Sequence, residues 1–344
     1  MTKTISRRTL ALGAAAIASA GLVTRKVRAA DPIRLRISLD TAPSHMRNVS
    51  ILDYAAKLEK ASDNAIKVEV FHAGALFSDL NVTKALVQGQ VEMACPGTWT
   101  LTGFVPDFDF PNLPMLYGLP LSDVRKIVDG KTGALVNDLM LKKLKLRVLG
   151  PWLELGAQNW YTSSKPLHTF ADVKGLKIRN AGGAALGVRA RFFEAIPNTT
   201  AWPDVPLALS QGTFDGLVST NESCFSAKLW EAGLKYSLQD HQNINEYVPL
   251  ISDAFLAKLP GELSKMVLSL WKDNIATYRA NMGAAQERAL NELKSHGVQV
   301  TEPTQAEIAA LRAKMLVDQE KLVKDLKMDA DISKMIAADM GAAA

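Results

Sequence analysis

The chain has 344 residues, of which 48% are hydrophobic and 22% charged, and its 40 basic and 35 acidic residues give a net charge of +5. Six of the basic residues and none of the acidic ones lie within the first 30 residues. Removing these six from 40 leaves 34 basic against 35 acidic residues, a charge near −1. The remainder of the chain therefore gives no charge-based reason to expect nucleic acid or an anionic membrane as a partner.

The first 30 residues have the pattern of a secretory signal peptide. Basic residues precede an apolar run from Leu10 to Val23, and the small residues Ala29 and Ala30 follow. The run is shorter than the roughly 20 residues that span a bilayer. This order predicts export and removal of residues 1–30. The pair Arg7 and Arg8 resembles a twin-arginine signal, but adjacent arginines also occur in ordinary secretory leaders, so both export routes stay open.

The chain beyond residue 30 is long enough for two domains. Its two cysteines, Cys95 and Cys224, are too few for a disulfide framework. In an exported chain they could pair, but a chain of this size can also bury thiols in its core. We expect free, buried thiols.

Alternating and short apolar runs predict strands at 33–39, 66–71, 91–95, 146–149, 176–179, 214–219 and 247–251. Helical periodicity predicts helices at 49–62, 80–88, 184–194, 263–275 and 308–326. The proline-rich segment 106–120 reads as a loop. Strands that alternate with helices predict an α/β fold with a largely parallel sheet.

The usual catalytic and cofactor motifs are missing from the sequence. The five histidines do not pair at metal-binding spacing, which argues against a metal site. Gly130-Lys131-Thr132 lacks the earlier glycine of a phosphate loop, and Gly182-Gly183 lacks dinucleotide-binding spacing. Asp240 beside His241 could suggest a base with its orienting acid, but we interpret the pair as a surface loop. We predict no catalytic residue, metal or cofactor.

One strand end has the features of an anion site. The predicted strand 176–179 ends in Arg179, directly before a glycine turn and the start of a helix. Arginine presents a planar fork of donors that fits a carboxylate, and a helix N-terminus adds main-chain donors. Taken alone, this pattern favours a surface arginine at a strand end over an anion site.

Four segments, together with their order and spacing over nearly the whole chain beyond residue 30, resemble the substrate-binding subunits of TRAP transporters, the DctP-type family. They are IKVEVFHAGAL from residue 66, KALVQGQVEMA from 84, DVKGLKIRNAGGAALG from 172 and AWPDVPLALSQGTFDG from 201. The resemblance implies an α/β, two-lobed periplasmic binding protein fold with crossing strands and a long lobe-spanning helix. It implies one lobe of residues 31–155 plus 245–283 and another of 156–244 plus 284–344.

The resemblance also implies a function and partners. The protein would be a monomeric periplasmic receptor that binds a small organic acid between its lobes and delivers it to a TRAP membrane permease. A dicarboxylate, a 2-oxo acid, a sugar acid and an aromatic acid all stay open as ligands. A receptor that feeds a sensor would have the same binding chemistry. The alternative from another class is a periplasmic enzyme that acts on a small organic acid in the same cleft.

The resemblance carries over to particular residues. Arg179 matches the arginine that pairs with the ligand carboxylate, and Trp202 matches the aromatic residue that packs against the ligand. Ser219 and Asn221 follow the Asp215-Gly216 pair, where the family offers a polar side chain. Asn159 stands where many members carry a second basic residue, and an amide supplies hydrogen bonds without a counter-charge. For the facing lobe we expect lining residues among Thr98, Trp99 and Ser44, with His45 beside it.

Overall fold

The computed structural model describes residues 31–341, and the chain from Pro32 onward forms one compact unit. The predicted signal peptide lies outside the described residues. Among the helices of residues 31–341, none is both long and apolar enough to cross a membrane. Cys95 and Cys224 are free and buried, as the sequence predicts.

The first sheet has five strands in the order β2-β1-β3-β12-β4. Their bounds are β1 Ile33–Ser38, β2 Ile66–Phe71, β3 Met93–Ala94, β12 Leu250–Ser252 and β4 Leu146–Val148. Strand β1 pairs in parallel with β2 and β3, whereas β12 runs antiparallel to both β3 and β4. The C-terminal half of the chain therefore returns to complete a sheet that the N-terminal half begins.

The second sheet has six strands in the order β13-β10-β6-β9-β7-β8. Their bounds are β13 Gln299–Thr301, β10 Tyr236–Leu238, β6 Asn159–Thr162, β9 Gly216–Ser219, β7 Lys177–Asn180 and β8 Ile196–Thr199. The pairs β7–β8, β7–β9 and β10–β13 are parallel, and β6 is antiparallel to both of its neighbours. Both sheets are thus mixed, because β12 in the first sheet and β6 in the second run antiparallel to their neighbours.

Two strands carry the chain between the sheets. Strands β5 (Leu153–Ala157) and β11 (Ile244–Tyr247) pair antiparallel in a ribbon of their own. Strand β5 follows β4 of the first sheet and precedes β6 of the second, and β11 makes the return passage from β10 to β12. This topology confirms the predicted α/β binding-protein fold with crossing strands, although both sheets are mixed and the sequence predicts a largely parallel one. The exact lobe boundaries stay a prediction.

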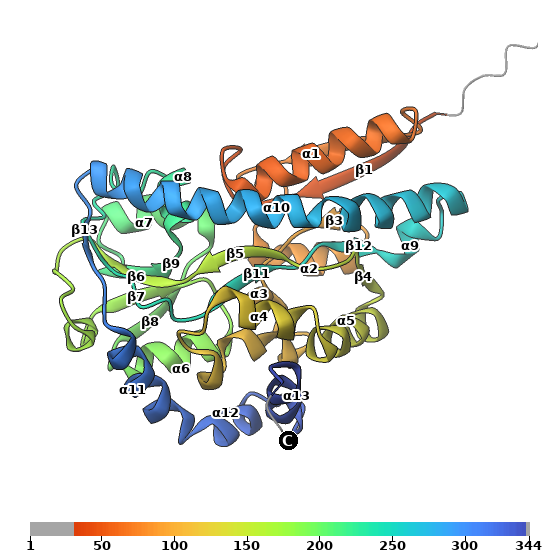
Figure 1. The fold of residues 1–344 in the computed structure, drawn as a ribbon. Coiled ribbons are helices and arrows are strands. Elements are labelled where there is room, and N and C mark those ends of the chain that lie inside the picture. The colour runs from red at the N-terminus through yellow and green to blue at the C-terminus, as the bar shows by residue number, and fades with distance from the viewer. Residues whose placement is uncertain (1–30, 342–344) are drawn as a thin grey trace, which may run out of the picture. The chain divides into compact units, whose positions relative to one another are not determined.

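The long helix is confirmed too. Helix α10 spans Gly261–Ser295 and packs against α1 (Met46–Ala61) and α8 (Asn221–Ser226), which belong to the parts of the chain around different sheets (Figure 1). Its face toward β1 buries Trp271 and Tyr278 beside Tyr54 of α1. Helix α10 therefore packs against the apolar cores of both sheets.

The other helices surround the sheets (Figure 1). They are α2 Asp79–Val87, α3 Thr98–Leu101, α4 Leu121–Val128, α5 Lys131–Leu144, α6 Ala184–Phe192, α7 Val205–Ser210, α9 Asp253–Leu256, α11 Gln305–Leu316, α12 Gln319–Asp325 and α13 Ile332–Asp339. The segment predicted as a loop contains two buried 3₁₀ helices, Pro106–Asn112 and Pro114–Leu116. Short 3₁₀ helices have 3.0 residues per turn, so a search for the α-helical period of 3.6 does not detect them.

Two predicted elements are divided in the structure. The predicted helix 308–326 breaks between Leu316 and Gln319, where α11 ends and α12 begins. The predicted strand 247–251 includes the end of β11 and the start of β12, with Val248 and Pro249 between them. Pro249 has no N–H to continue a ladder, so the apolar run is shared by two strands of different sheets.

Candidate ligand-binding site

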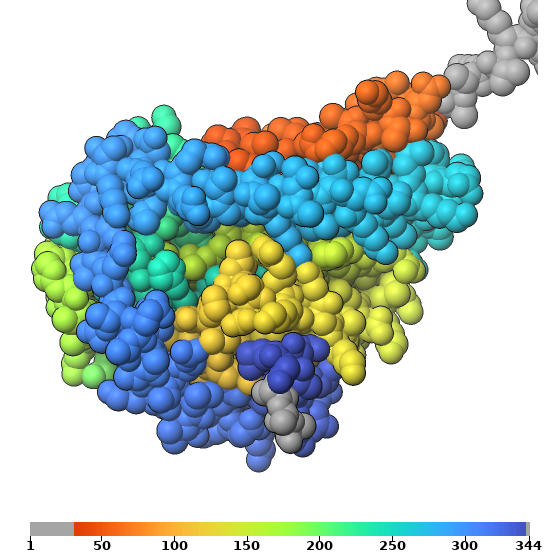
Figure 2. All heavy atoms as spheres, in the orientation of Figure 1, coloured from red at the N-terminus to blue at the C-terminus, as the bar shows by residue number. Residues whose placement is uncertain are grey.

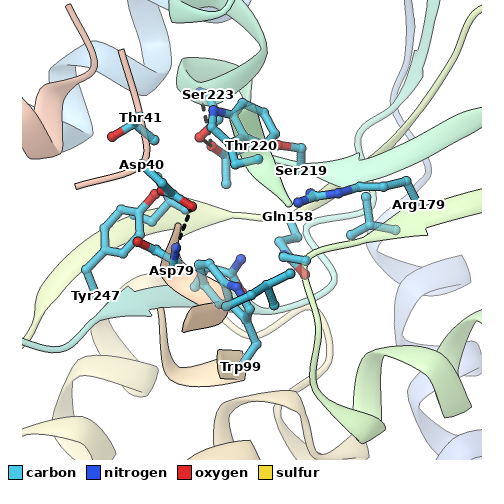
Figure 3. A pocket seen from close by; sticks show the side chains of 16 residues that line it. Asp40, Thr41, Asp79, Trp99, Gln158, Arg179, Ser219, Thr220, Ser223 and Tyr247 are labelled. Carbon is cyan, nitrogen blue, oxygen red and sulfur yellow. Dashed lines mark hydrogen bonds between the residues drawn. The ribbon is translucent and has the colours of Figure 1, made fainter. Parts of the chain in front are cut away.

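A cavity lies where the ends of strands from both sheets meet the crossing ribbon (Figure 3), and its volume is about 30 Å³. We call it the central cavity. Polar or charged side chains and a few apolar ones line it: Asp40, Thr41, Asp79, Leu80, Trp99, Leu155, Gln158, Arg179, Ala181, Trp202, Val218, Ser219, Thr220, Ser223, Asn245 and Tyr247. Its walls come from the two sheets and from both crossing strands.

Arg179 forms the wall that belongs to the second sheet. It lies in β7 and is only 3% exposed, and its guanidinium points into the cavity in Figure 3. Its Nε and Nη2 donate to the main-chain oxygen of Thr200 at 3.0 and 2.8 Å, and the guanidinium carbon lies 5.3 Å from the centre of the Trp202 ring. Main chain and ring thus fix the orientation of the planar group.

The charge of Arg179 has no direct partner in the described part of the chain. No carboxylate of residues 31–341 comes within 4 Å of its guanidinium nitrogens. Arg47 and Arg279, also buried, form ion pairs with carboxylates, and the buried Arg189 donates to the side-chain amide of Asn243. Burial lowers the pKa of Arg179 to about 10, and the charge of Asp40 acts against this effect. The group is therefore still protonated at neutral pH, and it presents unused donors to the cavity.

The opposite wall holds two carboxylates, Asp40 after β1 and Asp79 at the first position of α2. Between them lies Arg47, in the first turn of α1 and fully buried. Its Nη2 donates to Asp40 Oδ1 at 2.6 Å and its Nη1 to Asp79 Oδ2 at 2.7 Å. The ring of Tyr247 lies 4.1 Å from its guanidinium carbon. A loop and two helix N-termini thus gather three charged groups in one buried cluster.

The two carboxylates share one cation, which affects their protonation. Burial raises the pKa of Asp79 to about 8, against the attraction of Arg47, and the neighbouring Asp40 raises it further. The main-chain N–H of Asp79 also donates to Asp40 Oδ2 at 3.0 Å (Figure 3). Burial and the second carboxylate thus favour the protonated form of Asp79, and Arg47 opposes them.

Hydroxyl and amide groups fill the rest of the polar surface. Ser219 ends β9, and the next residue, Thr220, caps α8 by accepting from the N–H of Ser223. The hydroxyl of Ser223 lies 3.0 Å from Nε2 of the buried His45. Gln158, at the end of β5, adds an amide. The walls of the cavity therefore offer charged and hydrogen-bonding groups, together with the rings of Trp99 and Trp202.

Four of the residues predicted from the sequence line the central cavity: Arg179, Trp202, Ser219 and Trp99. Thr98 is buried at the first position of α3, next to Trp99, and its side chain lines none of the cavities described in this section. Ser44 lines a separate surface pocket with Met46 and Glu222.

Asn159 and Asn221 line a second cavity, between α10 and residues 118–121. Figure 2 shows a hollow between α10 and the yellow helices on this face. The Oδ1 of Asn159 accepts from the main-chain N–H of His241 at 2.9 Å, and the Oδ1 of Asn221 accepts from the hydroxyl of Tyr161 at 2.6 Å. These two amides thus hold the loop after β10 and strand β6 in place.

Sequence reasoning missed the acidic wall. Asp40 could have been found because it follows the carboxyl end of a predicted strand, and Asp79 because it opens a predicted helix. Arg47 gives no such signal, since a charged residue early in a helix is ordinarily exposed.

The interpretation of Asp240 and His241 as a surface loop is wrong for Asp240. His241 is exposed, but Asp240 is fully buried and accepts from the Tyr117 hydroxyl at 2.5 Å and from Trp160 Nε1 at 2.9 Å. The two side chains make no hydrogen bond to each other, since the described partners of the Asp240 carboxylate are Tyr117 and Trp160, so they do not form a base with its orienting acid.

Comparison with known proteins identifies related chains. The family model "Bacterial extracellular solute-binding protein, family 7" matches residues 38–325. The 2,3-diketo-L-gulonate-binding periplasmic protein YiaO of Escherichia coli is 25% identical over 313 residues, covering 88% of this chain and 90% of YiaO. The C4-dicarboxylate-binding periplasmic protein DctP of Rhodobacter capsulatus is 25% identical over 278 residues, covering 78% of this chain and 79% of DctP.

Solved structures share the fold. The sugar acid binding protein of Advenella mimigardefordensis in complex with galactonate superposes with a TM-score of 0.84 at 22% identity, covering 91% of this chain and 99% of that one. A TRAP periplasmic solute binding protein of Sulfurospirillum deleyianum with bound succinate gives a TM-score of 0.81 at 22% identity, covering 89% and 98%. The same architecture thus holds chemically different acids.

Proposed function

Because the chain belongs to the bacterial extracellular solute-binding protein family 7, the receptors of TRAP transporters, we propose that it captures a small organic acid in the central cavity. Members of this family are binding proteins and not enzymes. The observation that carries the proposal is the buried charge of Arg179, whose unused donors face the cavity without a carboxylate from the described chain.

The binding step follows from the geometry of Arg179. A ligand carboxylate that approaches its free nitrogens gains charge-assisted hydrogen bonds and supplies the missing counter-charge in a buried site. Trp202 lies against the guanidinium and offers an apolar face to the ligand, and Ser219 offers a hydroxyl. Since the walls come from two sheets, a bound acid holds both and favours their closed arrangement by binding it more tightly.

The place of action and the partner are part of the proposal. Several relatives are named as periplasmic binding proteins, which supports export directed by residues 1–30 and action in the periplasm. We propose further that the protein acts as a monomer. The closed, ligand-bound form would then deliver the acid to the permease subunits of a TRAP transporter.

A thermal-unfolding screen of the purified protein against organic acids tests the proposal. An acid at about 100 times its Kd should add about 2.7 kcal/mol of stability to the wild type. Arg179→Ala should lose this gain. Arg189→Ala is the matched control, because Arg189 is also buried and also donates to a main-chain oxygen, that of Asn112, but lies outside the central cavity. An equal gain in Arg179→Ala would remove Arg179 as the carboxylate anchor.

A further inference from the structure

Resting on the proposed function, we propose that the ligand carries a hydrogen-bond-donating group, an ammonium or a hydroxyl, at the end opposite its carboxylate. Asp40 and Asp79 receive this group and select against a second carboxylate. Figure 3 shows Asp40 facing Arg179 across the central cavity, with Asp79 beside Asp40. The argument depends on which donors are already used on each wall.

Arg47 has no donor left for a ligand. A guanidinium has five N–H donors, and Arg47 uses all five within its cluster. Nη1 donates to Asp79 and to the main-chain oxygen of Cys95, Nη2 donates to Asp40 and Thr41, and Nε donates to Thr41. The hydroxyl of Thr41 donates in turn to Asn48. A second ligand carboxylate would therefore meet an arginine that is close but already saturated.

Arg179 is in the opposite situation. Only its Nε and one N–H of Nη2 are used, both on the main-chain oxygen of Thr200. Within residues 31–341, Nη1 makes no hydrogen bond. Three donors therefore stay available for one ligand carboxylate, and the cavity has a single wall suited to that group.

The charge balance of the walls points the same way. Arg47 neutralises one of the two carboxylates, and the other holds either a proton or a negative charge in a buried site. An ammonium can replace that proton, and a hydroxyl can donate to the ionised oxygen. A carboxylate at the same place would be a third acidic group beside one cation, which is electrostatically unfavourable at low local dielectric.

Matched acids separate these cases. Isothermal titration calorimetry of the purified protein would compare succinate with 4-aminobutanoate and 4-hydroxybutanoate, and glutarate with 5-aminopentanoate and 5-hydroxypentanoate. Within each set the acids have equal length and differ only in the distal group. We expect a donor-bearing acid to bind at least tenfold more tightly than the dicarboxylate of its length. Binding of an ammonium should also release a proton at pH 7, seen as a dependence of the heat on the buffer.

Variants assign the preference to the acidic wall. Asp79→Asn should reduce it by at least fivefold. Asp253→Asn is the matched control, because Asp253 also opens a helix and also pairs with an arginine, Arg147, but lies outside the central cavity. If Asp79→Asn does not fold, Asp40→Asn takes its place, and the wild-type comparison needs neither variant.

The outcomes distinguish this inference from the proposed function. Dicarboxylates that bind as tightly as the donor-bearing acids, or more tightly, overturn the inference and leave an organic-acid receptor. A preference that Asp79→Asn and Asp40→Asn do not change also overturns it. If no acid of either kind binds here or in the wider screen, the proposed function fails as well. A preference that is lost in Asp79→Asn and kept in Asp253→Asn supports the inference.

Discussion

The buried carboxyl of Asp240 gives a sharp test of the electrostatics of this fold. Its Oδ2 accepts from Tyr117 and Trp160, while Oδ1 has no hydrogen-bond partner within residues 31–341. Burial raises the pKa of Asp240 to about 7, although both aromatic donors and Arg189 act to lower it. Replacement by Asn keeps the volume and the acceptor but removes the titration. The change therefore isolates one proton.

The sign and size of the effect follow from linkage. Between pH 4 and pH 7 the folded state holds a proton on Asp240 that the unfolded chain has released, so the stability from this group falls as the pH rises. The group contributes fully below pH 4, and its contribution is lost by about pH 7. A rise from 3.8 to about 7, at about 1.4 kcal/mol per pH unit, corresponds to about 4 kcal/mol. Between pH 4 and pH 7, the free energy of unfolding of Asp240→Asn should therefore rise by about 4 kcal/mol relative to that of the wild type.

Urea unfolding of both proteins at one-unit steps from pH 4 to pH 8 measures this difference, and constant m-values would show that the unfolded state is unchanged. Tyr117→Phe provides a second variant: without its hydroxyl the pKa of Asp240 should rise further, so that stability keeps falling above pH 7. If the two proteins differ by the same free energy at pH 4 and at pH 7.5, Asp240 titrates normally and the reasoning is refuted.

Two further predictions concern the walls of the central cavity. Arg47→Met should cost about 3–5 kcal/mol in urea unfolding, because it leaves Asp40 and Asp79 buried without their cation; a loss below 1 kcal/mol would mean that the cluster is solvated. Gly97→Ala should weaken the binding of any acid found in the screen, as measured by calorimetry. The added Cβ would come within 2.1 Å of the Trp99 ring and force that ring to move. Unchanged affinity would show that Trp99 does not shape the site.

Much of the fold is predictable because its signals are local. The alternation at 33–39 and 66–71 becomes β1 and β2, and the apolar face at 263–275 becomes part of α10. The crossing strand β5 is harder to predict, since Leu153–Ala157 is buried at one end and open to a cavity at the other, and has no regular alternation. The mixed strand order is set by contacts between segments far apart in the chain, such as β12 with β3, which periodicity does not report.

The site divides in the same way. Arg179 is recognisable from the resemblance of segment 172–187 to the family, since its place between a strand and a glycine turn also fits a surface arginine. Its counterpart wall is not, because Arg47 owes its role to carboxylates that approach from two other segments. The sequence shows only an arginine in a predicted helix, whereas in the folded chain all five of its N–H donors are used. Asn159 and Asn221, which the sequence predicts as ligand-binding residues, accept in the structure from the main-chain N–H of His241 and the hydroxyl of Tyr161.

The charges that select a ligand also bear on how an empty receptor behaves. Arg179 lies in β7 of the second sheet, Asp40 follows β1 of the first sheet and Asp79 begins α2, and all three are buried in the structure. Without a ligand, Arg179 loses its hydration and gains no contact with either carboxylate, so closure is electrostatically costly. A ligand that pairs with both walls removes this cost, whereas one that satisfies a single wall removes only part of it. Affinity and closure should therefore rise together across the matched acids, because both depend on the same two walls.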